Sequence, residues 1–230
     1  MIVVPTYNER DNLEALHAEV RRVLPSADLL IVDDASPDGT GVLADGLAAR
    51  DPQVRVLHRP AKLGLGTAYR DGFGVALRDG YDFVFEMDAD FSHSPDDLVR
   101  LLAAARDGAD LAIGSRYVPG GGTRNWGRLR RLISRGGSLY ARTILGVAVR
   151  DLTSGFKCFR KSALLGLDLG RLHSEGYAFQ IEVTYRLLRR GARVVEVPIV
   201  FVDRRVGLSK MSRRILLEAV AVVWRLRFSA

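Results

Sequence analysis

Two carboxylates separated by a single residue are the strongest chemical signal in this sequence. Asp88 and Asp90 come directly after a short apolar run, residues 83–87. Because alternate residues of an extended segment point to the same side, both carboxylates can face one divalent cation. Hard oxygen ligands suit Mg²⁺ or Mn²⁺, and the phosphates of a nucleotide would complete the ligand shell. A D-x-D pair can also be a solvated acidic turn, but its position at the end of an apolar strand favours the metal site.

A second acidic pair, Asp33 and Asp34, follows the apolar run 29–32. Either carboxylate could accept hydrogen bonds from the base or the ribose of a nucleotide. Alternatively, one of them caps the helix that follows, a role that Ser36 or Asp38 could take instead. Polar clusters follow two other apolar runs in the same way, Pro5-Thr6-Tyr7-Asn8-Glu9 and Ser115-Arg116-Tyr117.

A glycine-containing turn, Gly64-Leu65-Gly66-Thr67, stands at the start of a predicted helix with Lys62 beside it. A helix N-terminus and a lysine together could bind phosphate, so Lys62 is a candidate binding residue, although a simple turn is the alternative. The turn does not fit the dinucleotide fingerprint, because Tyr69 stands where a small residue is needed. This departure argues against a nicotinamide-dependent oxidoreductase.

Short apolar runs alternate with amphipathic stretches through the first half of the chain, which predicts an α/β fold with a Rossmann-like, mainly parallel sheet and helices on both faces. The expected strands cover residues 2–5, 29–32, 54–57, 83–87 and 111–114, and the expected helices cover 12–24, 39–49, 67–77 and 95–105. In such sheets ligands lie beyond the carboxyl ends of the strands. The polar clusters should therefore converge on one edge.

The second half is less regular. Helices are expected over 129–145 and 174–190, and a strand over 194–202 in which Pro198 indicates an edge position or a bend. A C-terminal amphipathic helix over 213–227 either packs on the core or lies in a membrane interface, and Trp126 and Trp224 are expected in the core. We expect a single domain, 1–230, with a nucleotide and metal half at about 1–118 and an acceptor and membrane-facing half at about 119–230.

The chain is basic, with a formal net charge of +7, and the charge is concentrated in runs that mix arginines with apolar residues, 124–135 and 203–214. Such runs suit a membrane surface or phosphate groups. A nucleic-acid-binding module is disfavoured by the acids at the strand ends. The single cysteine, the lack of a signal peptide and the lack of a long apolar stretch predict a protein of a reducing compartment that does not cross a membrane by itself.

Nine stretches, taken in order, resemble the GT-A glycosyltransferases of family 2, and most closely the polyprenyl- or dolichyl-phosphate mannose synthases of the type without transmembrane helices. They cover nearly the whole chain: VVPTYNERDNL, LLIVDDASPDGT, LGLGTAYRDGF, FEMDADFSHSPDDL, IGSRYVPGG, RRLISRGGSLYAR, DLTSGFKCFR, EGYAFQIEV and VPIVFVDRRVGLSK.

The resemblance implies a GT-A fold and inverting, metal-dependent transfer of mannose from GDP-mannose to a polyprenyl monophosphate, at the cytoplasmic face of a membrane. It implies attachment by surface helices or by a membrane-anchoring protein partner, and the chain could also be one module of a longer polypeptide. The residues that it places at the nucleotide are Pro5, Tyr7, Glu9, Asp33 and Asp34, those at the metal Asp88 and Asp90, and those near the phosphates Arg116, Arg130, Ser134, Arg135, Arg204 and Lys210. Some relatives have a metal-binding glutamine where this chain has Ser92, so a water is expected in its place.

The acceptor that the resemblance implies needs no catalytic base, because a phosphate monoester with a second pKa of about 6 is already ionised at neutral pH. Two alternatives remain open. The first is the same reaction with UDP-glucose as donor. The second is a hydroxyl acceptor, which would require a carboxylate base such as Glu175 or Glu182.

Overall fold

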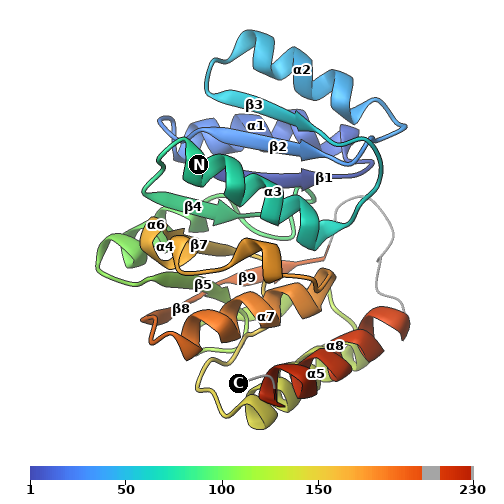
Figure 1. The fold of residues 1–230 in the computed structure, drawn as a ribbon. Coiled ribbons are helices and arrows are strands. Elements are labelled where there is room, and N and C mark those ends of the chain that lie inside the picture. Colours follow the sequence, from blue (N-terminus) through green and yellow to red (C-terminus); the bar gives the residue numbers. More distant parts are fainter. Residues whose placement is uncertain (204–212, 229–230) are drawn as a thin grey trace.

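A seven-stranded sheet forms the centre of the protein in a computed structural model, which describes residues 1–203 and 213–228, with the backbone only for 213–219. The strand order is β3-β2-β1-β4-β7-β5-β8 (Figure 1). The strands are β1 Ile2–Thr6, β2 Leu29–Asp33, β3 Val54–His58, β4 Phe83–Glu86, β5 Leu111–Ser115, β7 Lys157–Arg160 and β8 Val194–Pro198. The GT-A-like α/β fold with a mainly parallel sheet is confirmed.

One strand of this sheet, β7, was not expected from the sequence. It lies between β4 and β5 and is antiparallel to both, whereas the other neighbouring strands pair in parallel. Phe85 and Ala112 both face Cys158 across the two ladders. The strand therefore joins the two halves of the sheet and places residues from after position 150 beside the Asp88 loop.

Helices cover both faces of the sheet, as expected. Two hydrophobic cores result, and side-chain alternation divides β1 between them, with Ile2 and Val4 in one core and Val3 in the other. The first core contains residues of α1, α2 and α4, and the second residues of α3, α6 and α7. The helices are α1 Arg10–Val23, α2 Thr40–Arg50, α3 Leu65–Arg78, α4 Asp97–Arg106, α5 Arg128–Leu145, α6 Lys161–Leu165, α7 Gly176–Arg189 and α8 Arg213–Phe228, with a 3-10 turn at Leu169–Arg171.

The single strand expected over 194–202 is two strands in the structure. After β8, the chain bends at Pro198 and continues as β9 (Val200–Val202), which pairs in parallel with β6 (Gly122–Arg124) in a separate two-stranded sheet. Proline has no N–H for a sheet ladder, which explains why the main sheet ends there. The small sheet brings residues after β5 next to the end of the main sheet.

The helices α5 and α8 lie side by side at one end of the molecule, beside α7 (Figure 1). Val222, Val223 and Leu226 of α8 are buried in the core. The expectation that Trp224 is a core residue was wrong, because its side chain is 45% exposed and stacks on Phe228, whereas Trp126 is buried as expected. No helix in the described ranges has the length and apolar character needed to cross a membrane.

Candidate active site

The carboxyl ends of β1, β2 and β4 bring the acidic clusters of the sequence to one edge. These strands are neighbours in the sheet, and Thr6 at the end of β1 is in register with Asp33 at the end of β2. Thr6 donates a hydrogen bond from its hydroxyl to Asp33 over 2.9 Å, and Ser36 donates to the same carboxylate from its N–H (3.0 Å) and its hydroxyl (2.6 Å). The N-cap of α2 is Gly39, and Asp38 before it accepts from the N–H and hydroxyl of Thr40, the first residue of the helix.

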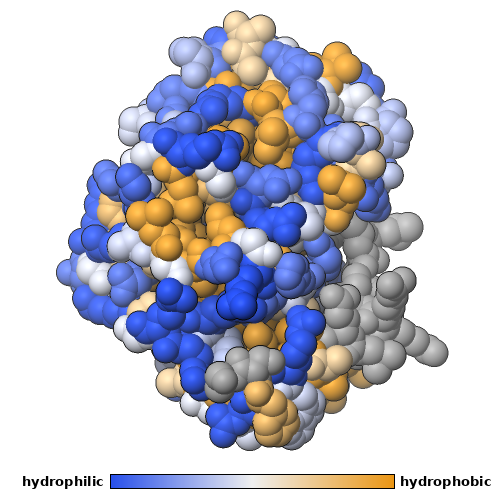
Figure 2. Space-filling view, viewed as in Figure 1, coloured by the Kyte–Doolittle hydropathy of each residue, from blue (hydrophilic) through white to orange (hydrophobic). Residues whose placement is uncertain are grey.

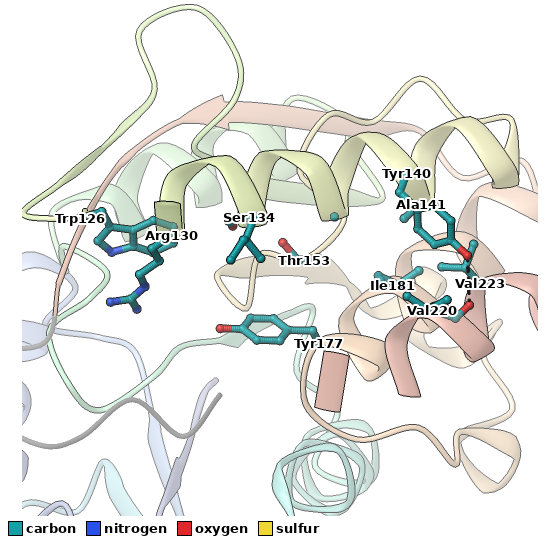
Figure 3. A pocket seen from close by; sticks show the side chains of 12 residues that line it. Trp126, Arg130, Ser134, Tyr140, Ala141, Thr153, Tyr177, Ile181, Val220 and Val223 are labelled. Atoms are coloured by element: carbon teal, nitrogen blue, oxygen red, sulfur yellow. Dashed lines mark hydrogen bonds between the residues drawn. The ribbon is translucent and has the colours of Figure 1, made fainter. Parts of the chain in front are cut away.

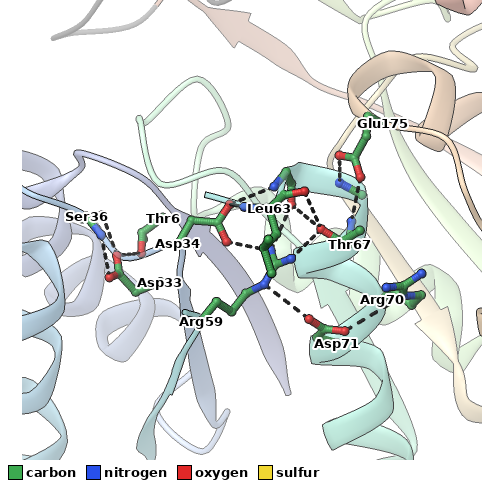
Figure 4. Close-up of polar contacts among 12 residues, drawn as sticks. Thr6, Asp33, Asp34, Ser36, Arg59, Leu63, Thr67, Arg70, Asp71 and Glu175 are labelled. Carbon is green, nitrogen blue, oxygen red and sulfur yellow. Dashed lines mark hydrogen bonds and ion pairs between the residues drawn. The ribbon is translucent and has the colours of Figure 1, made fainter. Parts of the chain in front are cut away.

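Asp34 organises the glycine-containing turn before α3 (Figure 4). Its carboxylate forms a buried ion pair with Arg59 at 2.7 Å and accepts hydrogen bonds from the backbone N–H groups of Leu63 (3.2 Å) and Gly64 (3.0 Å). The same turn places the Lys62 ammonium 3.9 Å from the centre of the Tyr7 ring. Two candidate nucleotide residues from distant parts of the chain therefore contact each other.

Glu175 holds the other side of this turn. It precedes the first residue of α7 and accepts hydrogen bonds from the backbone N–H groups of Gly66 (2.8 Å) and Thr67 (3.3 Å) in the first turn of α3. Its carboxylate is therefore part of the structure of the turn. Glu182, the other candidate base, is buried and forms an ion pair with Arg186 at 2.7 Å.

Glu9 and Pro5 complete the loop region after β1. Glu9 accepts a hydrogen bond from the side chain of Asn12 (2.9 Å), and its backbone N–H donates to the Thr40 hydroxyl (3.0 Å). Pro5 pairs with Val32 in the parallel ladder and is half-buried. This loop is thereby fixed against the start of α2.

Asp88 and Asp90 follow β4 and differ in exposure. The Asp88 side chain is 33% exposed and accepts a hydrogen bond from the Tyr69 hydroxyl at 3.4 Å, whereas Asp90 is buried and accepts from the Ser92 N–H at 3.0 Å. His93 is buried against Phe156, and its Nδ1 lies 3.9 Å from Asp88 Oδ2. Burial lowers the pKa of His93 to about 4, so its imidazole is neutral at physiological pH.

The two carboxylates offer a donor set that fits a hard divalent cation. No group of three or more His, Cys, Asp or Glu side chains within the described ranges could hold a metal ion. A cation bound by Asp88 and Asp90 would therefore need further oxygen ligands from a diphosphate and water, which is how Mg²⁺ is commonly bound beside nucleotides.

A buried polar group supports this loop from inside the sheet. The Lys157 ammonium on β7 lies 3.9 Å from the Glu86 carboxylate on β4 and donates to the carbonyl oxygen of Gln180 at 3.1 Å. Burial raises the pKa of Glu86 to about 7 and lowers that of Lys157 to about 8. The pair ties β4, the strand that precedes Asp88, to α7.

Arg116 follows β5, and its guanidinium is buried and bonded to other side chains of the protein. Its guanidinium donates two hydrogen bonds to Asp151, at 2.8 and 2.6 Å, and a third to the Thr153 hydroxyl at 2.8 Å. Burial alone would lower the pKa of Arg116, but the negative charge of Asp151 raises it above its ordinary value, so the guanidinium stays charged. The ion pair fixes the segment 151–155, and a side chain added at Gly155 would lie 3.9 Å from Asp88 Oδ2.

A groove opens between α5, α7 and α8 (Figure 3). Trp126, Arg130, Ser134 and Thr153 provide the polar groups of its wall, and Figure 3 shows Trp126 and Arg130 together at one end. The opposite end is apolar, and its lining includes Tyr140, Ala141, Ile181, Val220 and Val223. Thr153 lines the groove and accepts a hydrogen bond from Arg116, so it links the groove to the Arg116–Asp151 pair. Gly155, two residues later, lies beside Asp88.

Of the remaining candidate residues, Arg130 and Ser134 line the groove, Arg135 follows them on α5, and two lie outside the described ranges. The Arg130 guanidinium forms an ion pair with Asp203 at 2.8 Å and lies 4.3 Å from the centre of the Trp126 indole. Ser134 accepts a hydrogen bond from the Tyr117 hydroxyl at 2.6 Å, and the Arg135 guanidinium lies 5.9 Å from the Tyr117 ring. Arg204 and Lys210 fall in residues 204–212, which the structure does not describe.

Comparison with known proteins decides the family. The sequence profile described as Glycosyl transferase family 2 matches residues 1–166. The chain belongs to glycosyl transferase family 2. Family relatives include polyprenol monophosphomannose synthase of Mycolicibacterium smegmatis, 50% identical over 99% of this chain and 87% of that protein, and undecaprenyl-phosphate mannosyltransferase of Micrococcus luteus, 51% identical over 98% and 92%. Dolichol-phosphate mannosyltransferase of Pyrococcus furiosus is 36% identical over 98% of this chain and 62% of its own length.

A solved structure shares the fold of this family 2 member at low sequence identity. Glucosyl-3-phosphoglycerate synthase from Mycobacterium tuberculosis, in complex with Mn²⁺ and UDP-glucose, superposes with a TM-score of 0.73 at 18% identity, over 98% of this chain and 77% of that one. This likeness concerns the arrangement of helices and strands.

Several residues of the family 2 site could not be found by reading motifs. Three of them form hydrogen bonds with side chains 25 to 37 positions away, Arg59 with Asp34, and Asp151 and Thr153 with Arg116. No spacing in the sequence indicates these contacts. Trp126 was expected in the core, and it is buried, but it also lines the groove. The only available signal for Trp126 was its place inside the basic run 124–135.

Proposed function

We propose that this family 2 glycosyltransferase transfers mannose from GDP-mannose to a polyprenyl monophosphate, with inversion at the anomeric carbon. The observation that carries the proposal is the groove, because polar groups gather at one end and apolar side chains line the other, as an amphiphile with a phosphate head requires. The names of the relatives at 50% and 51% identity support the same acceptor and sugar.

The donor would bind at the sheet edge in front of β1, β2 and β4. We assign the base and ribose to Pro5, Tyr7, Glu9, Asp33 and Asp34, with Lys62 reaching the phosphates from the turn before α3. The contact between Lys62 and Tyr7 supports this assignment, because it gathers a positive charge and an aromatic face at one place.

We propose Mg²⁺ or Mn²⁺ as the cofactor, held by Asp88 and Asp90. When bound, the cation neutralises the negative charge that develops on the leaving diphosphate. The two carboxylates are oriented by hydrogen bonds from the chain itself. The Ser92 N–H donates to Asp90, and the Tyr69 hydroxyl donates to Asp88.

On the acceptor side the protein has to position an anion. An oxygen of the ionised acceptor phosphate attacks the anomeric carbon of the donor, and the bond between that carbon and the nucleotide diphosphate breaks. No proton has to be removed from the nucleophile. Arg130, Ser134, Arg135, Arg204 and Lys210 would bind the acceptor phosphate, with orientation by charge-assisted hydrogen bonds. Arg116 contributes by holding Thr153 and the segment next to Asp88.

The exposed side of α5 supports binding to a membrane surface. Leu129, Leu132 and Leu139 are 70%, 70% and 59% exposed and are flanked by exposed arginines, among them Arg128 and Arg131. In Figure 2, apolar side chains reach the surface between hydrophilic ones over the end of the molecule that carries α5 and α8. We place the protein at the cytoplasmic face of a membrane, where anionic lipids attract arginines, attached by these helices alone or with a membrane-anchoring protein partner.

A transfer assay tests the function directly. Purified protein is mixed with radiolabelled GDP-mannose, a polyprenyl phosphate and Mg²⁺ or Mn²⁺, and label is followed into the organic phase, with UDP-glucose as donor in a parallel reaction. Metal-dependent extraction of mannose supports the proposal. Lipid-linked label only from UDP-glucose would contradict the donor, and no lipid product from either donor would contradict the acceptor.

A further inference from the structure

The indole of Trp126 carries a polar group that the fold itself does not use. Its side chain is 7% exposed, and its Nε1 has no hydrogen-bond partner among the described residues. Buried N–H groups in native proteins are nearly always paired, and an unpaired one costs free energy. A bound ligand is one explanation for a donor that is kept buried and unpaired.

The surroundings of the indole show what such a ligand would be. Trp126 lines the groove at the end where Arg130 lies, and the Arg130 guanidinium is positioned over the indole face, 4.3 Å from its centre. Phe201 packs edge-on against the same ring with centroids 5.2 Å apart. The ring is therefore held by packing on its faces and edge, and a positive charge lies beside it. Although Asp203 pairs with this arginine, an unpaired N–H donor beside a guanidinium suits an anion with oxygen acceptors.

Three other polar side chains of the groove, those of Arg130, Ser134 and Thr153, already have protein partners. Arg130 donates through Nη1 to both oxygens of Asp203, at 2.8 Å each, and Ser134 accepts from Tyr117. Thr153 accepts from Arg116. The indole N–H is thus a donor whose use breaks no hydrogen bond of its own, and because the atom is buried, a phosphate reaches it as the side chains that cover it shift.

We propose that the Trp126 Nε1–H donates a hydrogen bond to a phosphate oxygen of the lipid acceptor and so helps to select a phosphorylated over a non-phosphorylated prenyl chain. This inference rests on the proposed function, because it assumes that the groove binds the acceptor. Trp126 is a binding residue in this assignment and takes no part in bond breaking.

Two variants test the proposal. The W126F substitution keeps an aromatic ring and deletes the N–H, and W224F is the matched control on the exposed side of α8, in a protein that contains only these two tryptophans. With a short-chain polyprenyl phosphate, W126F should raise the acceptor KM about tenfold or more, as expected for the loss of a hydrogen bond to a charged group. The donor KM should change less than about twofold, and W224F should change neither.

Tryptophan emission measures ligand binding directly, and a purely structural role of Trp126 would not make that emission depend on the phosphate of the ligand. In the W224F protein all indole emission comes from Trp126, and titration with polyprenyl phosphate should change that emission saturably. The corresponding polyprenol should give a much smaller change, as should inorganic phosphate, which lacks the chain that fills the groove. In W126F the preference for polyprenyl phosphate over polyprenol in binding should fall about tenfold.

The outcomes separate this inference from the function on which it rests. If wild-type protein transfers mannose to the lipid but W126F keeps the wild-type acceptor KM, the role of Trp126 is wrong. Equal emission changes with polyprenol or with inorganic phosphate would also overturn it. If wild-type protein makes no lipid product, the proposed function fails, whereas the emission titration still decides whether Trp126 contacts a lipid phosphate. That titration uses W224F, so it remains decisive even if W126F does not fold.

Discussion

Glu175 accepts a hydrogen bond from the backbone N–H of Gly66 over 2.8 Å and thereby joins the start of α7 to the start of α3. The approach is so close that a side chain at Gly66 would lie 2.4 Å from the Ser174 carbonyl oxygen, and one at Gly64 would lie 2.5 Å from the Glu175 carboxylate. Gly64 also has φ +109°, which side chains rarely adopt. The close approach of Glu175 therefore explains Gly64, and that of the Ser174 carbonyl explains Gly66.

We expect E175Q to reduce kcat by less than about tenfold, because loss of a helix-capping carboxylate costs on the order of 1 kcal/mol. The donor KM should rise severalfold as the turn that carries Lys62 loosens. Steady-state kinetics with both substrates measure these effects, and E14Q on the exposed face of α1 is the control. Loss of kcat by a factor of about 100 or more would instead indicate a general base and would favour a hydroxyl acceptor.

We expect D90N to abolish nearly all transfer, because the amide keeps the shape of the side chain but removes a negative charge from the cation site. Binding of Mn²⁺, measured by electron paramagnetic resonance in the presence of GDP, should weaken in parallel. D96N is the matched control, since Asp96 lies six residues away, is 66% exposed and pairs with Arg22 at the surface. Wild-type turnover by D90N in a buffer with chelator would contradict the metal site.

We expect the double substitution L129E/L132E to reduce binding to vesicles that contain anionic lipid by about tenfold or more. Burying a leucine in an apolar environment stabilises by about 1.5–3 kcal/mol, and two glutamates also add repulsion from the lipid charge. Co-sedimentation with vesicles measures the effect. V42E on α2 is the control, because Val42 is 78% exposed and α2 packs on the far edge of the sheet, at β3. Equal sedimentation of both variants would remove α5 from the membrane contact.

The elements with regular apolar runs were predictable, and so was the place of Asp88 and Asp90 at the end of one of them. β7 was missed because its sequence, Lys157-Cys158-Phe159-Arg160, begins and ends with a positive charge. Lys157 is nevertheless fully buried, since Glu86 lies 3.9 Å away and partly compensates its charge. A buried ion pair of this kind hides a core strand from any reading based on hydropathy.

Side-chain partners across the fold were not predictable for a different reason. Trp224 lies in an amphipathic stretch, and the pattern does not indicate which turn of the helix contacts α5 and α7. The prediction that it is a core residue was therefore wrong. Arg116 follows a strand end, and this position predicts a place near the candidate site. No spacing or motif indicates that Asp151, 35 residues later, binds its guanidinium.

The Arg116–Asp151 pair supports a last prediction about stability. Both side chains are almost completely buried, at 4% and 0% exposure, so neither can be solvated if the other loses its charge. Removing one partner of such a pair costs about 3–5 kcal/mol, and for a chain of this size each kcal/mol shifts Tm by about 2–4 °C. We therefore expect D151N to lower Tm by about 6–20 °C in a thermal melt followed by circular dichroism.

The exposed pair of Asp168 and Arg171 supplies the control, because D168N removes a surface contact of 3.8 Å and should shift Tm by about 2 °C or less. The double variant R116M/D151L leaves no uncompensated charge and should recover part of the lost Tm. It should still transfer poorly, because Thr153 loses the donor that positions it beside the groove. If D151N melts like the wild type, the pair does not hold segment 151–155, and Arg116 is then available to bind phosphate directly.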